Sequence, residues 1–230
     1  MLSRIPVPES AARKIQTMIL TGELKSGEKV PSQREFSQML KVSRASLREA
    51  LLTLETLGLL KTEPGRGTFI SHERPSAGRD MAPWRYAETY SVHDVFETRL
   101  MIEGQIAALA AQTLAEQQLQ RLERATDAME RFWEAGDLLA NVEADVEFHG
   151  VIVSHCGNRL LVDLYQSIRD KLTETQRQPI PKTEPARMSE SIAEHRSLIK
   201  ALRARDAGKA RTAMERHIAN TARCAGVMIG

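Results

Sequence analysis

The sequence contains few of the residues that mark several common classes of protein. It has two cysteines in 230 residues, Cys156 and Cys224, which give neither a disulfide framework nor a Cys-x-x-Cys site and fit a reducing compartment. Aromatic residues make up only 4% of the chain, which favours a mainly α-helical protein over a β-sandwich or barrel. No apolar run is long enough to span a bilayer, and the first residues lead into prolines instead of a signal-peptide core. We therefore expect a cytoplasmic protein with no membrane partner.

Neither sign of charge dominates the chain, but the charges are distributed unevenly. The net charge is +2. Residues 1–70 contain 11 Lys and Arg against 7 Asp and Glu, a balance of +4, whereas residues 71–230 contain 21 against 23, a balance of −2. A basic first part suits a nucleic-acid partner, although charge alone is a weak indication. The length allows two modest domains that each bury a core.

The stretch from Val30 to Ile70 has the pattern of two short helices joined by a sharp turn. Ser32 and Glu35 have the spacing of a capping box, in which each side chain accepts a hydrogen bond from the backbone N–H of the other residue. Ser43 offers a second N-cap soon afterwards. Leucines then recur at the helical spacing of a buried stripe, at Leu47, Leu51, Leu54 and Leu57. This pattern predicts a helix-turn-helix.

A β-hairpin is expected directly after these helices. Two short apolar runs flank the turn Glu63–Gly67, whose glycines permit positive φ. The hairpin would form a wing with one arginine at its tip. Arginine forks can pair with guanine edges or phosphates, and serines with phosphate oxygens. The residues predicted to bind DNA are Arg34, Ser43, Arg44, Ser46, Arg48, Gly65, Arg66 and Gly67.

The remainder of the chain is expected to be an antiparallel bundle of six to seven α-helices. Prolines and glycines between Ser71 and Tyr90 indicate a linker. The predicted domains are therefore residues 1–72, a linker at 73–90, and residues 91–230. Apolar periodicity and helix-breaking residues predict helices at 92–113, 116–135, 137–156, 158–177, 186–205 and 207–228.

Several ionisable residues fall on the apolar faces of these predicted helices. Asp145 and His149 share one inward stripe a turn apart, while His195 and His217 lie on the inward faces of two later helices. Unpaired charge is costly to bury, so these groups should bind each other, water or a ligand. One carboxylate and three imidazoles suit one divalent transition ion per chain, such as zinc, nickel or manganese, with coordination positions left open. A lone inward histidine is more often a hydrogen-bonded core residue, but three histidines and an aspartate together favour the metal site.

The first seventy residues resemble the GntR family of bacterial winged helix-turn-helix repressors. The resemblance rests on Gly27–Ser32 and on Ser43–Leu51. The chain from about Val92 onward resembles the ligand-sensing FCD domain of the FadR subfamily, through residues 96–103, residues 145–149, Glu194, His195 and His217. In metal-containing members of that subfamily, an aspartate and three histidines hold the ion and small organic acids bind beside it. The resemblance therefore implies that Asp145, His149, His195 and His217 are metal ligands and that Arg99 binds the effector's carboxylate.

These observations predict a homodimeric transcriptional regulator and not an enzyme. Its two recognition helices would bind a palindromic operator in double-stranded DNA, and a small organic acid bound in the helical domain would control the affinity, most simply by relieving repression. One alternative is a metalloenzyme acting on a small organic acid, for which Glu103 is the candidate general base on an inward face. A DNA-architectural protein without an effector is a further alternative, but it leaves the inward polar cluster unexplained.

Overall fold

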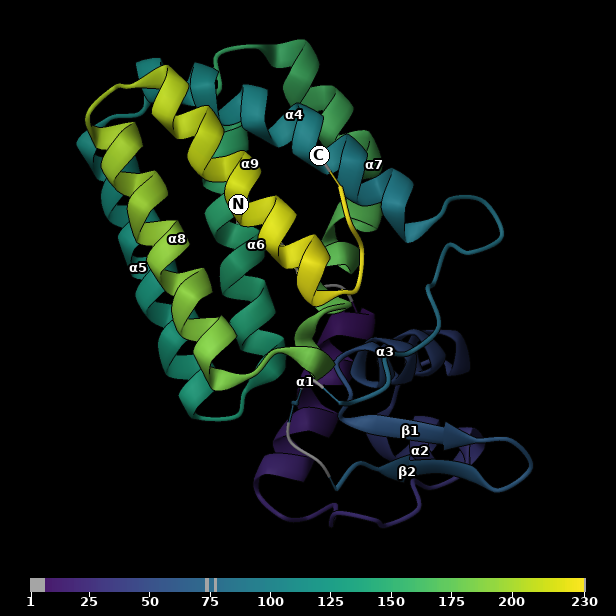
Figure 1. Ribbon diagram of the computed structural model, residues 1–230. Helices are drawn as coiled ribbons and strands as arrows, with labels where there is room; N and C mark the ends of the chain where they lie inside the picture. Colours follow the sequence, from purple (N-terminus) through teal and green to yellow (C-terminus); the bar gives the residue numbers. More distant parts are fainter. Residues whose placement is uncertain (1–6, 73–74, 77, 230) are drawn as a thin grey trace.

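The computed structural model describes residues 7–72, 75–76 and 78–229. Its N-terminal part is a group of short helices followed by a β-hairpin, and its C-terminal part is a helical bundle (Figure 1). The elements of the N-terminal part are α1 (Val7–Leu20), α2 (Gln33–Leu40), α3 (Arg44–Thr56), β1 (Leu60–Glu63) and β2 (Gly67–Ile70). The predicted fold class, mainly α with a winged helix-turn-helix and a bundle, is confirmed.

The two helices of the helix-turn-helix begin where the sequence predicts. The Ser32 hydroxyl accepts from the backbone N–H of Glu35 at 3.3 Å, and the Glu35 carboxylate accepts from the backbone N–H of Ser32 at 3.1 Å. Lys41 ends α2 in the left-handed conformation, and Ser43 caps α3 by accepting from Ser46 N at 3.0 Å. The predicted leucine stripe of α3 and Leu57 is buried. Helix boundaries are thus set by local hydrogen bonds, and the crossing of the helices by burial of the leucines.

The hairpin after α3 is antiparallel, with Leu60 opposite Ile70 and Glu63 opposite Gly67. Gly65 and Gly67 both adopt positive φ, at 74° and 119°, which side-chain-bearing residues rarely adopt and which closes this tight turn. The tip of the wing therefore projects beyond the helices (Figure 1).

The bundle follows a linker without regular secondary structure in its described residues. Its helices are α4 (Val92–Thr113), α5 (Glu116–Glu134), α6 (Leu138–Ser154), α7 (Arg159–Arg177), α8 (Pro185–Arg203) and α9 (Ala207–Cys224), with a short 3₁₀ turn η1 (Ile180–Lys182) before α8. The predicted boundaries hold to within two residues except at the end of α9, expected at residue 228. Gly226 there adopts φ of 77°, and Val227 N donates to Ala222 O at 2.9 Å, which terminates the helix early.

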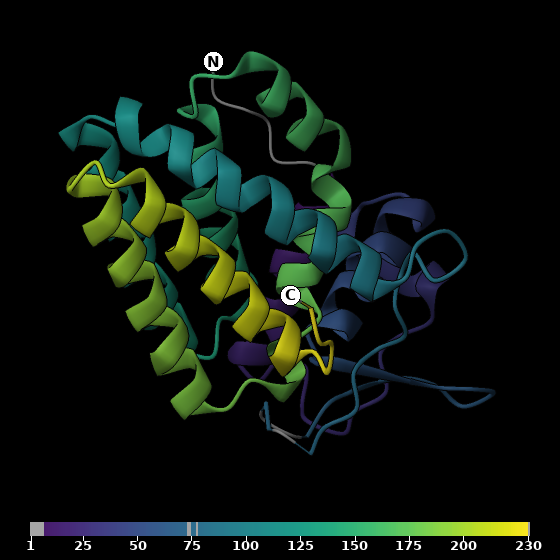
Figure 2. The same ribbon diagram turned by 45° about the horizontal axis from the view of Figure 1, so that its top comes forward.

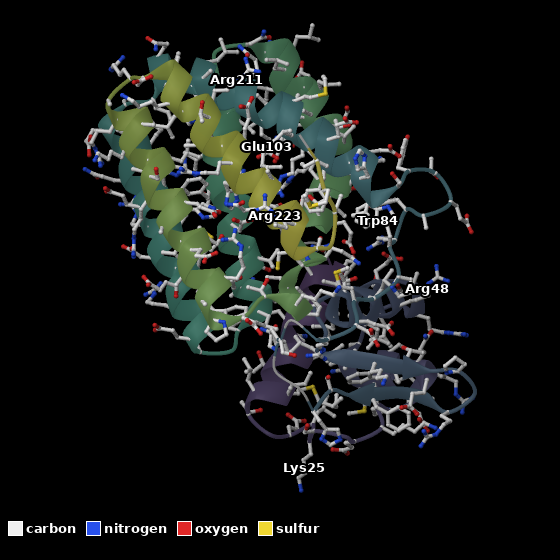
Figure 3. All side chains as sticks on the ribbon, in the orientation of Figure 1. Lys25, Arg48, Trp84, Glu103, Arg211 and Arg223 are labelled. Carbon is white, nitrogen blue, oxygen red and sulfur yellow. The ribbon has the colours of Figure 1, made fainter. Side chains whose placement is uncertain are left out.

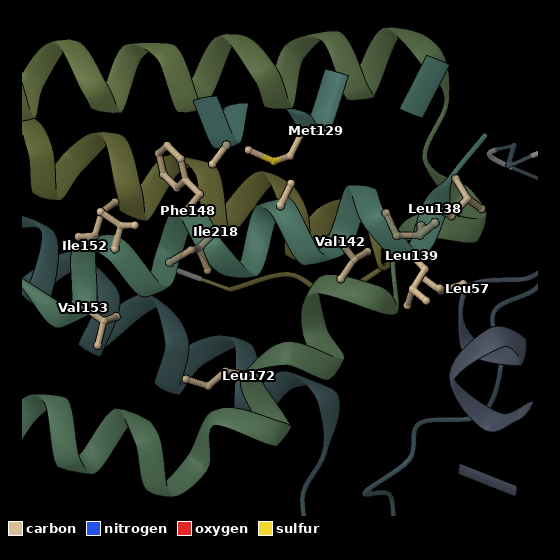
Figure 4. Packing of buried hydrophobic residues seen from close by; sticks show 14 of the residues in the cluster. Leu57, Met129, Leu138, Leu139, Val142, Phe148, Ile152, Val153, Leu172 and Ile218 are labelled. Atoms are coloured by element: carbon tan, nitrogen blue, oxygen red, sulfur yellow. The ribbon is translucent and has the colours of Figure 1, made fainter. Parts of the chain in front are cut away.

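Helix α6 is the centre of the bundle. It packs against α5, α4 and α7, while α9 packs against α4 and α8 (Figure 2). Figure 4 shows Val142, Phe148 and Ile152 along α6, surrounded by side chains such as Met129 of α5 and Leu172 of α7. Because most sides of α6 are buried, polar residues on it must find partners inside the protein. Within the described residues, no helix is long and apolar enough to cross a membrane.

Candidate functional site

The four predicted metal ligands come together in the interior of the bundle. Asp145 and His149 are provided by α6, His195 by α8 and His217 by α9, and each offers one ligand atom within 4.8 Å of the others. The three imidazoles are buried, and the Asp145 side chain is 18% exposed. The i and i+4 spacing places the two α6 residues one turn apart on the same face. Three helices distant in sequence therefore meet at one point.

Each histidine has its Nδ1 nitrogen held by a protein acceptor. His149 Nδ1 donates to Glu103, His195 Nδ1 to the Ser191 carbonyl oxygen at 2.7 Å, and His217 Nδ1 to Glu194 at 2.9 Å. A neutral imidazole that donates from Nδ1 has an unprotonated Nε2. Such outer hydrogen bonds fix the orientation and raise the basicity of metal-binding histidines. All three rings are therefore prepared to bind a cation through Nε2.

His195 Nε2 is the polar atom that most directly indicates a missing partner. It is buried and has no hydrogen bond, although Asp145 Oδ1 lies only 3.0 Å away. The contact does not have hydrogen-bond geometry, and in a neutral His195 ring whose Nδ1 donates to Ser191 both facing atoms are acceptors. A buried polar atom without a partner is costly. A cation bound between these atoms satisfies both of them, so the residues fit a divalent transition metal ion.

The electrostatics of the cluster favour the deprotonated forms of Asp145 and His217, which metal binding requires. Burial alone would raise the pKa of Asp145, but the neighbouring histidines outweigh this effect and hold it well below its usual range. Burial and the nearby His195 lower the pKa of His217 to about 4. Glu194, in spite of its burial, has its pKa lowered to about 2 by hydrogen bonds from His217 and Arg187. At neutral pH the aspartate is thus ionised and His217 is neutral.

Arg99 and Glu103 form a buried pair beside the cluster. Arg99 donates from Nε to Glu103 at 2.6 Å and from NH1 to the Thr175 hydroxyl at 3.3 Å, and its NH2 lies 3.2 Å from His149 Nε2. Burial opposes the ionisation of Glu103, but Arg99 and His149 lower its pKa to about 2. Glu103 is therefore an orienting partner of His149 and a poor general base. The assignment of Arg99 to effector binding stays a prediction, with NH2 as its donor nearest to the cluster.

A cavity adjoins the cluster. Asp145 and His217 line it, and it offers about 50 Å³ to the centre of a water molecule, several times the roughly 10–15 Å³ that one water needs. A second, more open hollow shares Arg187 and Cys224 with this cavity and leads toward solvent. The polar part of the cavity's lining includes Asn141, Thr183 and Ser191. The apolar part includes Met129, Val142 and Met188. The cavity suits a small ligand with oxygen atoms on an apolar carbon frame.

Sequence reasoning missed the residues that orient the ligands. Glu194 accepts a hydrogen bond from His217. It also accepts hydrogen bonds from the two terminal guanidinium nitrogens of Arg187, at 3.0 and 2.9 Å. Gln176 donates to Asp145 Oδ2 at 2.6 Å. The spacing of Arg187 and Glu194 by seven residues on one helix is a signal for their ion pair. Nothing in the local sequence indicates that Glu194 meets a histidine of the next helix.

The residues predicted to bind DNA lie at the surface of the N-terminal part. Arg34, Arg44, Arg48 and Arg66 are exposed, and Arg48 projects from the edge of this part (Figure 3). The Ser43 hydroxyl is engaged in capping α3, and Ser46 lies 2.9 Å from it. Arg66 pairs with Glu63 and lies 5.6 Å from the centre of the Phe69 ring, with its side chain 73% exposed. The glycines Gly65 and Gly67 form the turn that presents Arg66.

Comparisons with known proteins agree with this architecture. Residues 8–70 match the family of bacterial regulatory proteins, gntR family, and residues 94–220 match the FCD domain. The chain is 30% identical over 210 residues to the HTH-type transcriptional regulator LutR of Bacillus subtilis (strain 168), covering 88% of this chain and 94% of that protein. It is 29% identical over 224 residues to the HTH-type transcriptional repressor NanR of Cronobacter sakazakii (strain ATCC BAA-894), covering 94% of this chain and 84% of that protein.

Among solved structures, the chain is similar to E. coli McbR/YncC, with a TM-score of 0.52, 19% identity and 94% of each chain covered. This likeness supports the fold. The matched families and relatives are transcriptional regulators and not enzymes, which confirms that part of the prediction and gives no support to the metalloenzyme alternative. The chain therefore belongs to the GntR family of bacterial transcriptional regulators, in the FadR-like group whose DNA-binding domain is followed by an FCD domain.

Proposed function

We propose that this regulator is a metal-containing repressor whose affinity for its operator is set by a small carboxylate bound in the FCD domain. The observation that carries the proposal is the convergence of the Asp145 carboxylate and three histidine rings, each with its Nδ1 held by another acceptor, beside a cavity. Zinc, nickel or manganese suits this set of ligands, with one ion per chain. Repression is supported by the relative NanR, which is a transcriptional repressor.

The proposed effector site combines the ion with Arg99 and the cavity. An ion that takes more than four ligands would keep open positions beside these four residues, and a carboxylate oxygen could occupy one of them. Arg99 NH2 lies next to the ligand atom of His149, so one carboxylate can contact both the ion and the guanidinium. The effector is therefore a small organic acid.

The proposed output is binding of a homodimer to palindromic double-stranded DNA in the cytoplasm. The proposed DNA-contact set is the one predicted from the sequence, with Arg44 and Arg48 in the major groove and Arg66 on the wing. The matches at residues 8–70 and 94–220 support the division into a DNA-binding domain at 1–72, a linker at 73–90 and an effector and dimerisation domain at 91–230. Effector binding changes operator affinity through its different affinity for two states of the dimer.

Elemental analysis tests the metal site directly. Protein purified without a histidine tag should contain about one transition-metal ion per chain, and the His217→Gln variant should contain far less. His93→Gln is the matched control because His93 is exposed on α4 and lies outside the cluster. Folded wild-type protein that cannot be loaded with zinc, nickel or manganese would disprove the metal site.

A thermal-shift screen then tests the effector class. The metal-loaded protein should be stabilised by members of a panel of small mono- and dicarboxylates and sugar acids, and the same acids should change its affinity for DNA selected from random sequence by the wild-type protein. His217→Gln should lose both responses. Stabilisation by these acids in the metal-free variant would instead place the effector away from the ion.

A further inference from the structure

The segment Glu174–Thr183 lies between the metal cluster and the recognition helix α3. It comprises the last turn of α7, the 3₁₀ turn η1 and the residues around it. On one side, Gln176, Pro179, Ile180 and Thr183 line the cavity that contains Asp145 and His217. Its other side contacts the C-terminal end of α3. The two parts of the molecule meet here in both views (Figures 1 and 2).

The first contact with α3 is a buried hydrogen bond. The Thr56 hydroxyl, in the last residue of α3, lies 3.1 Å from Glu174 Oε1 and 3.1 Å from the Leu52 carbonyl oxygen. Thr56 and Glu174 are both almost completely buried, and Arg177 donates to the other Glu174 oxygen at 3.2 Å. A buried carboxylate that loses a donor is left with an unsatisfied oxygen. The end of α3 and the end of α7 are therefore held in one relative position.

The second contact is steric. Gly58 directly follows the end of α3, and a Cβ placed on it would lie 3.2 Å from Cβ of Pro181. Pro181 also accepts from Ser76 N at 2.9 Å through its carbonyl oxygen. Close-packed interfaces of this kind transmit small displacements because they have little free volume. The 3₁₀ turn that borders the cavity is thus packed closely against Gly58, the residue after the C-cap of the recognition helix.

Consecutive residues at the end of α7 connect the two sites. Glu174 binds Thr56, Thr175 accepts from Arg99 at 3.3 Å, and Gln176 donates to Asp145 Oδ2 at 2.6 Å. These residues belong to one hydrogen-bonded helical turn. Displacing the partner of one side chain therefore also displaces the neighbouring side chains of that turn. Asp145 presents its other oxygen to the histidines. Fixing Asp145 on an ion therefore also fixes Gln176.

We propose that Gln176 and Glu174 are positioning residues that couple occupancy of the metal site to the end of the recognition helix. The proposal rests on the proposed function because it requires an ion at Asp145. When the ion is bound, Asp145 holds Gln176, the last turn of α7 becomes more rigid, and Glu174 holds Thr56 and the end of α3. Without the ion, this turn and the end of α3 open more frequently. The coupling passes through a contiguous set of contacts between two distinct sites.

Hydrogen–deuterium exchange of the full-length protein, with and without bound zinc, tests this coupling. In the wild type, zinc should slow amide exchange in peptides covering the second half of α3 by roughly fivefold or more, within the usual range of allosteric coupling. Thr56→Val should bind zinc with unchanged affinity and lose this protection. Thr56→Ser retains the hydroxyl and should restore it. Thr126→Val is the matched control, since Thr126 is buried on α5 and its hydroxyl also donates to a carbonyl four residues earlier.

Gln176→Met provides a second variant at the other end of the connection. It removes the amide that contacts Asp145 and is expected to lower zinc affinity, so zinc is added to saturation; the zinc-loaded variant should then leave α3 unprotected. Wild-type protection in folded Thr56→Val or Gln176→Met protein would overturn the coupling, as would wild-type protein that binds zinc without any protection of α3. Failure of the wild type to bind zinc, nickel or manganese, measured separately by calorimetry, would overturn the metal site and the coupling with it.

Discussion

His217 donates from Nδ1 to the Glu194 carboxylate at 2.9 Å, across the interface between α9 and α8. The same carboxylate accepts hydrogen bonds from both terminal guanidinium nitrogens of Arg187. Glu194 thus stays ionised in a mostly buried position, and it orients His217 Nε2 toward Asp145 and the other histidines. This arrangement is the carboxylate–histidine pairing found around many metal ions.

Replacing Glu194 by glutamine should therefore weaken metal binding without removing a ligand. The variant keeps an acceptor for His217 but loses the charge that makes the ring more basic, and changes at such positions typically reduce metal affinity by about 10- to 100-fold. Competition with a chromophoric chelator measures the change. Glu190→Gln is the control, because Glu190 contacts Arg187 from an exposed position on the same helix. Equal affinities of the two variants would contradict this role for Glu194.

Removing the metal should lower the protein's thermal stability. An ion that binds only the folded state adds about 2.7 kcal/mol to the free energy of unfolding when it is present at 100 times its dissociation constant. Chelation of the wild-type ion should therefore lower Tm, and zinc should restore it. Asp145→Asn lacks the anionic ligand, so zinc should shift its Tm far less. A zinc-induced shift of wild-type size in this variant would show that the ion binds elsewhere.

Replacing Phe148 by alanine should destabilise the fold and disturb the site together. Phe148 is fully buried on α6, and its ring contacts His195 edge-on with centroids 4.4 Å apart. Loss of a buried phenylalanine side chain costs about 3–5 kcal/mol. Chemical denaturation measures that loss, and zinc affinity should fall as well because His195 loses its packing partner. Phe132→Ala, at a partly buried position on α5, should change stability less and leave zinc affinity unchanged.

Arg48 and Arg66 should contribute to DNA binding in different ways. Arg48→Ala should cost about 1–3 kcal/mol with selected DNA and relax the preference at one base position, because Arg48 is predicted to contact a base edge. Arg66→Ala should weaken binding to all sequences similarly and reduce the slope of log affinity against log salt by about 1, as expected for a phosphate contact. Fluorescence anisotropy titrations at several salt concentrations distinguish these results. Arg159→Ala, a highly exposed position on α7, is the control.

The sequence was sufficient to predict which side chains point inward but not which partners they meet. Periodicity placed Asp145, His149, His195 and His217 on buried faces, and the structure brings them together. The pairing of His217 with Glu194 depends on how two helices cross, which local spacing does not specify. Helix starts were predictable because Ser32 and Ser43 form their caps within three residues.

The contact between the two parts of the molecule was not predictable at all. Glu174, Thr175 and Gln176 are consecutive polar residues near a helix end, a pattern that normally indicates exposure, yet all three are buried. Their burial is possible because each finds a partner from a distant element: Thr56, Arg99 and Asp145. Tertiary contacts have here overridden the local preference. The contacts of Arg99 with Thr175 and His149 likewise depend on how the helices cross, which local spacing does not specify.

The DNA-binding domain precedes the helical bundle in the chain, and this order has a consequence during synthesis. The helix-turn-helix is complete by Ile70, whereas the last residue of the four-residue cluster, His217, lies near the C-terminus. At the usual rates of translation, about 5–20 residues per second, roughly 7 to 30 seconds separate the two points. A nascent chain therefore carries its DNA-binding surface well before the proposed metal site is complete, and a truncated product would retain that surface without the proposed effector site.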